Sequence, residues 1–123
     1  MRPTSPIPTS VRWALAAVAT VVVVGCASLA QPTAIDAAWA AEQWPEVTQA
    51  ELQRGRALYV KRCAGCHALR LPERFPTSAW QQHVDEMAKR AHLLPAEREP
   101  MLRYLVTMSR PGAGAKEAPS PPG

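Results

Sequence analysis

The five residues Cys63-Ala64-Gly65-Cys66-His67 constrain this chain more than any other segment. Two thiols three positions apart, followed at once by an imidazole, form the C-x-x-C-H pattern of covalent haem attachment. In that arrangement Cys63 and Cys66 would each form a thioether with one vinyl group of the same porphyrin. His67 would be the proximal ligand of the iron. The motif therefore predicts one covalently bound haem c.

Two other interpretations of the paired cysteines are a redox dithiol and part of a zinc site. A thioredoxin-like dithiol requires a βαβ context, and no strand-rich run surrounds the motif. A structural zinc site requires four ligands, and outside the motif the chain offers only Cys26, His83 and His92. The sequence therefore favours haem attachment over both.

Residues 1–25 have the pattern of an export signal. Arg2 and Arg12 are the charged residues of this segment, and an uncharged apolar run follows at residues 13–24. A basic stretch followed by such a run predicts transfer of the remaining chain out of the cytoplasm.

The export segment ends in Val23-Val24-Gly25-Cys26, which resembles a bacterial lipobox. Cys26 would then be the mature N-terminus and carry acyl chains, whose burial contributes about 0.8 kcal/mol per CH₂ to membrane binding. Cleavage after the small residues at 28–30 or 38–40 would instead release a soluble protein. The 18 uncharged residues 13–30 would also just suffice for an uncleaved anchor. All three alternatives place the protein on the periplasmic side of a bacterial membrane.

Composition divides the rest of the chain into three parts. Residues 26–43 are alanine-rich and are expected to form a flexible tether, and residues 44–110 are expected to form the folded domain. Residues 111–123 hold four prolines and three glycines, which predicts a disordered tail. A folded part of about 67 residues rarely buries enough apolar surface to be stable alone, so a haem would supply the missing core.

The charge balance of the chain excludes few classes of function. The chain has 14 Lys and Arg against 10 Asp and Glu, a formal net charge of +4. Loss of Arg2 and Arg12 with the signal would leave a net charge of +2. The two propionates of a haem would largely cancel this charge. The basic composition therefore does not predict nucleic-acid binding. Basic residues near the motif could steer an acidic redox partner or simply form a solvated helix face: Arg54, Arg56, Lys61, Arg62, Arg70 and Arg74.

The folded part is expected to contain three helices and no strand. The first spans residues 48–63 and begins with a capping box between Thr48 and Glu51. Gly55 lies on its apolar side, where a glycine often permits close approach of another helix. The side chains expected on this side are Leu52, Leu58 and Tyr59.

Two further helices are expected at residues 77–91 and from residue 95 to about residue 108. Thr77 or Ser78 would cap the earlier one, whose apolar face comprises Trp80, Val84, Met87 and Ala91. Pro95 suits the first turn of the last helix, and Pro100 is expected to bend it or delay its start to near Glu99. The inward-facing residues of this helix would be Met101, Leu102, Leu105 and Met108.

This arrangement of a helix running into C-x-x-C-H, a loop and a last helix resembles the class I c-type cytochromes. Gly55 with Tyr59 is similar to the small and aromatic pair at that family's helix crossing, and Tyr104-Leu105 is similar to its partner on the last helix. The resemblance covers about residues 48–109 and implies a small all-α, three-helix cytochrome c-like domain wrapped around one covalent haem. It departs from the family in one respect, because no methionine stands in a loop after the middle helix.

The sixth iron ligand therefore has several candidates. Met87 lies 20 residues after His67 on an apolar stripe, and His/Met ligation raises the reduction potential. Methionine also commonly fills gaps in a core, which is the alternative role for this side chain. His83 and His92 are the alternative ligands, and Met101 and Met108 are further candidates, although both look like packing positions on the last helix. An open or water-bound iron is the remaining case.

A single haem with both axial positions filled passes electrons and binds no small-molecule substrate. The expected function is a monohaem electron carrier, not an enzyme, that docks transiently with redox proteins or membrane complexes. Five-coordinate iron would instead suit a haem-based sensor or weak peroxidase. A third alternative is a haem subunit of a larger oxidoreductase. Nucleophilic catalysis is not expected, because the haem consumes Cys63 and Cys66.

Overall fold

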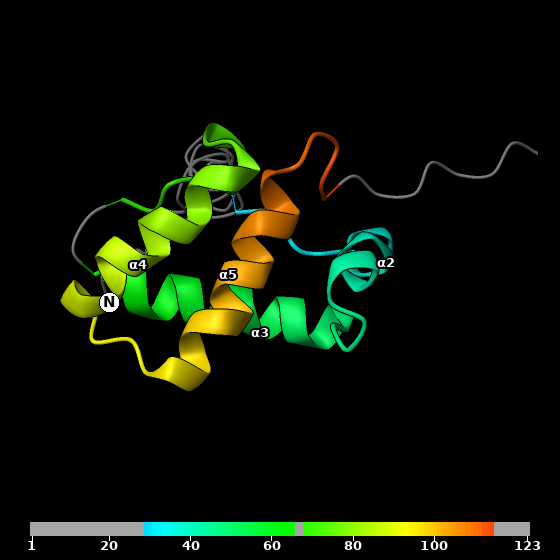
Figure 1. The fold of residues 1–123 in the computed structure, drawn as a ribbon. Helices are drawn as coiled ribbons and strands as arrows, with labels where there is room; N and C mark the ends of the chain where they lie inside the picture. Colours follow the sequence, from blue (N-terminus) through cyan, green and yellow to red (C-terminus); the bar gives the residue numbers. More distant parts are fainter. Residues whose placement is uncertain (1–28, 66–67, 115–123) are drawn as a thin grey trace, which may run out of the picture.

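The computed structural model describes residues 29–65 and 68–114. These residues form four α-helices, α2 (Ala34–Gln43), α3 (Gln49–Cys63), α4 (Trp80–Arg90) and α5 (Pro95–Ser109), with two short 3-10 turns and no strand. In Figure 1, α5 crosses α3, while α2 and α4 lie on opposite sides of α5. The predicted all-α class is confirmed, with four helices in the described part where three were expected. The export segment lies outside the described residues.

Helix α3 begins where the sequence predicted. The Thr48 hydroxyl accepts a hydrogen bond from the Glu51 amide at 3.2 Å, which satisfies one donor of the first turn. This is one of the two bonds of the expected capping box. The predicted inner face is also confirmed, because Leu52, Gly55 and Tyr59 are buried.

The crossing of α3 with α5 depends on Gly55. A Cβ atom added to this glycine would lie 2.8 Å from the Cβ of Tyr104 and would overlap the carbonyl of Pro100. The absence of a side chain therefore lets the two helix backbones come into direct contact. The predicted close approach at Gly55 is confirmed.

Helix α2 corrects the expectation of a flexible tether at residues 26–43 for the part that the structure describes, residues 29–43. Thr33 caps this helix, and its hydroxyl and amide form a reciprocal pair of bonds with Asp36. The Asp36 carboxylate is buried and also accepts hydrogen bonds from Arg110 and from the amide of Gly114. Residues on both sides of the predicted domain boundary are therefore part of one packed structure.

The segment before α2 is also fixed to the domain. Leu29 is buried in the main core, and its carbonyl accepts hydrogen bonds from the guanidinium of Arg56. The carbonyl of Ala30 accepts a hydrogen bond from the buried hydroxyl of Tyr104 at 2.9 Å. These contacts come from α3 and α5, so tertiary packing rather than local sequence orders this segment.

The middle helix is shorter than predicted. A 3-10 turn at Thr77–Ala79 leads into α4, and neither Thr77 nor Ser78 provides a side-chain cap. At the C-terminal end of α4, His92 adopts a positive φ of 50°. The Leu93 amide donates a hydrogen bond to the Ala88 carbonyl at 3.0 Å. This is the hydrogen-bond pattern that closes many helices, so His92 acts here as the residue that ends α4.

Helix α5 begins at Pro95, as predicted, and continues through Pro100. It therefore does not start near Glu99, which was one of the two expectations. Met101, Leu105 and Met108 are buried as expected, whereas Leu102 is half-buried. Across residues 29–65 and 68–114, no helix combines the length and apolarity needed to cross a bilayer.

Candidate haem site

A cavity of about 370 Å³ opens between α3, α4 and α5. Its volume lies in the range typical of small-molecule and cofactor sites. Helix α4 contributes Trp80, Val84 and Met87, and α5 contributes Met101 and Leu105. The walls are thus mainly apolar, and of these five side chains all except Met87 also belong to the main core.

Cys63 brings the predicted attachment motif to this cavity. It is the last residue of α3, it is half-buried, and it lines the cavity wall. Cys66 and His67 lie outside the described residues, as does Cys26. The structure therefore places the first residue of the motif at the edge of the cavity.

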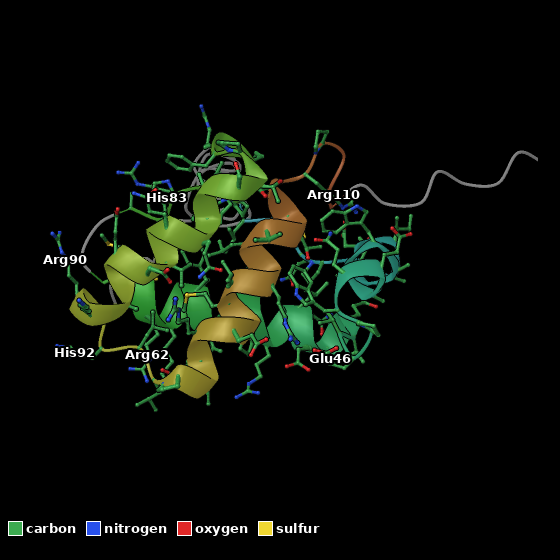
Figure 2. All side chains as sticks on the ribbon, viewed as in Figure 1. Glu46, Arg62, His83, Arg90, His92 and Arg110 are labelled. Carbon is green, nitrogen blue, oxygen red and sulfur yellow. The ribbon has the colours of Figure 1, made fainter. Side chains whose placement is uncertain are left out.

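Three arginines also line the cavity, Arg62, Arg70 and Arg90. Arg62 is held by Glu97 of α5, which accepts hydrogen bonds from two of its nitrogens at 2.7 and 3.2 Å. This pairing with Arg62, together with the Leu94 amide, lowers the pKa of the Glu97 carboxyl. In Figure 2, Arg90 projects outward at the end of α4, and Arg62 lies near the start of α5.

The candidates for the sixth ligand differ in their positions. Met87, His83 and Met101 line the cavity. The ring of His83 packs edge to face against Phe75 and Trp80, with centroid distances of 4.7 and 5.7 Å. His92 is exposed at the outer end of α4, as Figure 2 shows, and is not a wall residue. Met108 belongs to the core and is not a wall residue either.

Two buried aromatic side chains hold the loop that follows the motif. The hydroxyl of Tyr59 on α3 donates to the Arg70 carbonyl at 2.8 Å. The indole N–H of Trp80 on α4 donates to the Pro72 carbonyl at 3.1 Å. Burial is the main cause that raises the pKa of Tyr59, so this hydroxyl remains a donor over the physiological range.

Several wall residues were not singled out as site residues from the sequence, among them Arg90, Leu93 and Leu105. Helical spacing could have indicated Arg90, because it lies three residues after Met87 on the same face of α4. The hydrogen bonds of Tyr59 and Trp80 to loop carbonyls carry no sequence signal, because any residue supplies a backbone carbonyl.

The residues of this cavity fit a covalently attached haem. A flat macrocycle with two carboxylates requires apolar walls, cationic groups at the edge and a thiol within bonding reach. Trp80, Val84 and Leu105 provide the apolar surface, Arg70 and Arg90 provide cationic groups, and Cys63 provides a thiol. Within the described ranges, no group of three or more His, Cys, Asp or Glu residues could hold a bare metal ion.

Comparison with known proteins identifies the family. The sequence model of the dihaem cytochrome c family matches residues 59–122, which is 64 of the 123 residues. The match includes the C-x-x-C-H motif, helices α4 and α5 and all residues that line the cavity. No curated protein and no solved structure matches the chain. The chain belongs to the dihaem cytochrome c family.

Proposed function

We propose that this protein binds one haem c through Cys63 and Cys66 and transfers single electrons between redox proteins. Membership of a cytochrome c family supports covalent haem and electron transfer in general. The observation that carries the finer proposal is the position of Cys63 at the edge of an apolar cavity of about 370 Å³. When bound there, the haem supplies a reversible one-electron couple.

The proposal of a single haem rests on the cysteine count. The family is named for two haems, whereas these 123 residues contain three cysteines and one C-x-x-C-H motif. A second pair of thioethers would need two more thiols, and only Cys26 remains outside the motif. We therefore assign one haem to this chain.

His67 is proposed as the proximal ligand and Met87 as the distal ligand. Met87 is half-buried and lines the cavity from the last turn of α4, and Cys63 lines the same cavity from α3. A thioether ligand would raise the reduction potential relative to a second histidine. His83 is the alternative on the same wall, but its ring is held by Phe75 and Trp80.

The remaining wall residues exclude water and balance charge. Trp80 and Met101 are 3% and 1% exposed, so the inner wall is dry and rigid. Arg62 is already neutralised by Glu97, which leaves Arg70 and Arg90 as the arginines proposed to pair with the propionates. A dry, rigid wall limits rearrangement during electron transfer, which is the property that a carrier requires.

The proposed location is the periplasmic side of a bacterial membrane, with lipid on Cys26. Only Ala27 and Ser28 separate this cysteine from Leu29, which is buried in the core. Three residues span at most about 11 Å even when fully extended. A lipid on Cys26 would therefore hold the folded domain directly at the membrane surface, where membrane-bound redox complexes would be its natural partners.

Spectroscopy and potentiometry of the haem-loaded protein test this function. An electron carrier is expected to be low-spin in both oxidation states, to titrate reversibly with one electron, and to bind carbon monoxide slowly. High-spin iron that binds carbon monoxide rapidly would contradict the proposal and favour a sensor or weak peroxidase. Isolation only as a stable complex with a larger oxidoreductase would favour the role of a subunit.

A further inference from the structure

Glu97, in the first turn of α5, forms an ion pair with Arg62, which lines the haem cavity. Its Oε1 accepts hydrogen bonds from two nitrogens of Arg62 at 2.7 and 3.2 Å, and its Oε2 accepts one from the Leu94 amide at 3.1 Å. The side chains of Arg62 and Glu97 are 29% and 13% exposed. The carboxylate is therefore held at both oxygens and is largely shielded from solvent.

This ion pair differs from the others in the position of its arginine. Arg62 immediately precedes Cys63, and both residues line the cavity. The arginines of the other ion pairs in the described part of the chain are not wall residues of this cavity: Arg98, Arg103 and Arg110. Glu97 is not a wall residue either, so it is connected to the cavity through Arg62.

A charge beside a haem changes the reduction potential of the iron. The oxidised iron carries one more positive charge than the reduced iron, so a nearby cation favours the reduced form and a nearby anion favours the oxidised form. The inner wall of the cavity contains the buried side chains of Trp80 and Met101, and such a wall screens charges less than water does. An arginine paired with a carboxylate contributes little net charge to this wall, whereas an arginine without one contributes a full positive charge.

We propose that Glu97 is a positioning residue that lowers the reduction potential of the bound haem by holding and neutralising Arg62. The other charged wall residues are Arg70, Glu86 and Arg90. Without Glu97, the guanidinium of Arg62 would be a third cationic group at the wall and would be available to a propionate. This inference rests on the proposed haem and its one-electron couple.

The variant Glu97→Gln removes the charge of the carboxylate and keeps the shape of the side chain, with one oxygen that can still accept from the Leu94 amide. Glu99→Gln is the matched control, because Glu99 lies on the same helix and pairs at 2.5 Å with Arg103, which is not a wall residue. Arg62→Gln removes the opposite member of the pair, and a double variant removes both charges.

Potentiometric titration of the haem-loaded, full-length proteins is the measurement. Glu97→Gln should raise the reduction potential, with an equilibrium constant for reduction at least about threefold larger than in the native protein. Arg62→Gln should lower the potential, because it leaves the carboxylate without its cation. The double variant should return close to the native potential, and Glu99→Gln should leave the potential unchanged. A purely structural role of Glu97 would not give two shifts of opposite sign that cancel.

An unchanged potential in a folded, haem-loaded Glu97→Gln protein would overturn this inference, and so would an equal shift in Glu97→Gln and in the double variant. If Glu97→Gln does not fold around haem, an unchanged potential in Arg62→Gln would overturn the inference in its place. In each of these outcomes the native protein is still a one-electron carrier. A native protein without covalent haem would instead overturn the proposed function itself.

Discussion

Gly55 lies against Tyr104 so closely that a methyl group at position 55 would come within 2.8 Å of the Tyr104 Cβ. The same methyl group would overlap the carbonyl of Pro100, which is backbone and cannot move aside as a flexible side chain can. The helix that carries Cys63 therefore makes direct backbone contact with α5 at Gly55.

Gly55→Ala is expected to destabilise the protein by about 2 kcal/mol, because overpacking at this crossing exceeds the helix-propensity gain of about 1 kcal/mol. Denaturant unfolding of the haem-loaded protein measures this loss. Ala57→Gly, at an exposed position of the same helix, is the control and should cost about 1 kcal/mol from propensity alone. Greater stability of Gly55→Ala would show that the helices do not approach as closely as described.

This crossing was predictable from sequence, whereas helix α2 was not. Thr48, Gly55 and the period of Trp80 and Val84 are local signals, and each was interpreted correctly. Residues 34–43 are rich in alanine, and although Thr33 and Asp36 form a local capping signal, the composition favours a flexible tether over a packed helix. The contacts that order this helix join Asp36 to Arg110 and Gly114, which lie 74 and 78 residues away.

The lining of the cavity was predictable only in part. Cys63 and Met87, which the sequence singled out, both line it. The bonds of Tyr59 and Trp80 to loop carbonyls depend on how three segments meet in space. The closing role of His92 also escaped prediction, because its positive φ is a conformation that glycine and asparagine adopt more readily.

Asp36→Ala tests the link between α2 and the end of α5. The substitution leaves the guanidinium of Arg110, whose side chain is 16% exposed, without its carboxylate, and it also removes an acceptor from the Gly114 amide. We expect a loss of about 3 kcal/mol in unfolding free energy. Asp85→Ala is the control, because its pair with Arg98 is solvent-exposed on both sides and should be worth less than about 1 kcal/mol. Equal effects of the two substitutions would contradict a buried link.

Removal of residues 29–43 is a second test of the corrected domain boundary. A chain that begins at residue 44 loses the buried Leu29 and leaves the hydroxyl of Tyr104 without its acceptor, the Ala30 carbonyl. It should be less stable than a chain that begins at residue 29 by at least about 3 kcal/mol. Thermal unfolding of the two haem-loaded proteins provides the comparison. Equal melting temperatures would support the flexible tether that the sequence suggested.

Stability should fall at alkaline pH because of two buried tyrosines. Burial raises the pKa of Tyr59 from 10.0 to about 12 and raises the pKa of Tyr104 as well. The folded state therefore favours the neutral phenols, and the stability that they contribute is complete below about pH 10 and is lost as the pH rises toward about 12. Unfolding free energies measured across this window should fall, and less steeply in Tyr59→Phe. A flat profile would contradict the burial of these hydroxyls.

Met87→Leu tests the proposed distal ligand with little change in volume. Loss of the thioether should abolish the sulfur-to-iron charge-transfer band of the oxidised protein and lower the reduction potential. Met101→Leu removes the other methionine sulfur of the cavity wall and should preserve both properties. Each substitution should lower the free energy of unfolding by less than about 1.5 kcal/mol. Both variants should therefore stay folded, and their spectra and potentials can be compared directly. Loss of the band only in Met101→Leu would transfer the role to that residue.

Mass spectrometry of the mature protein tests the central claim most directly. Tryptic cleavage after Arg62 and Arg70 releases one peptide that contains Cys63, Cys66 and His67. We predict that this peptide carries one haem, that neither of its cysteines reacts with an alkylating reagent, and that the intact chain shows no second haem. Two alkylated cysteines on a peptide without haem, or a second covalent haem elsewhere on the chain, would contradict the account.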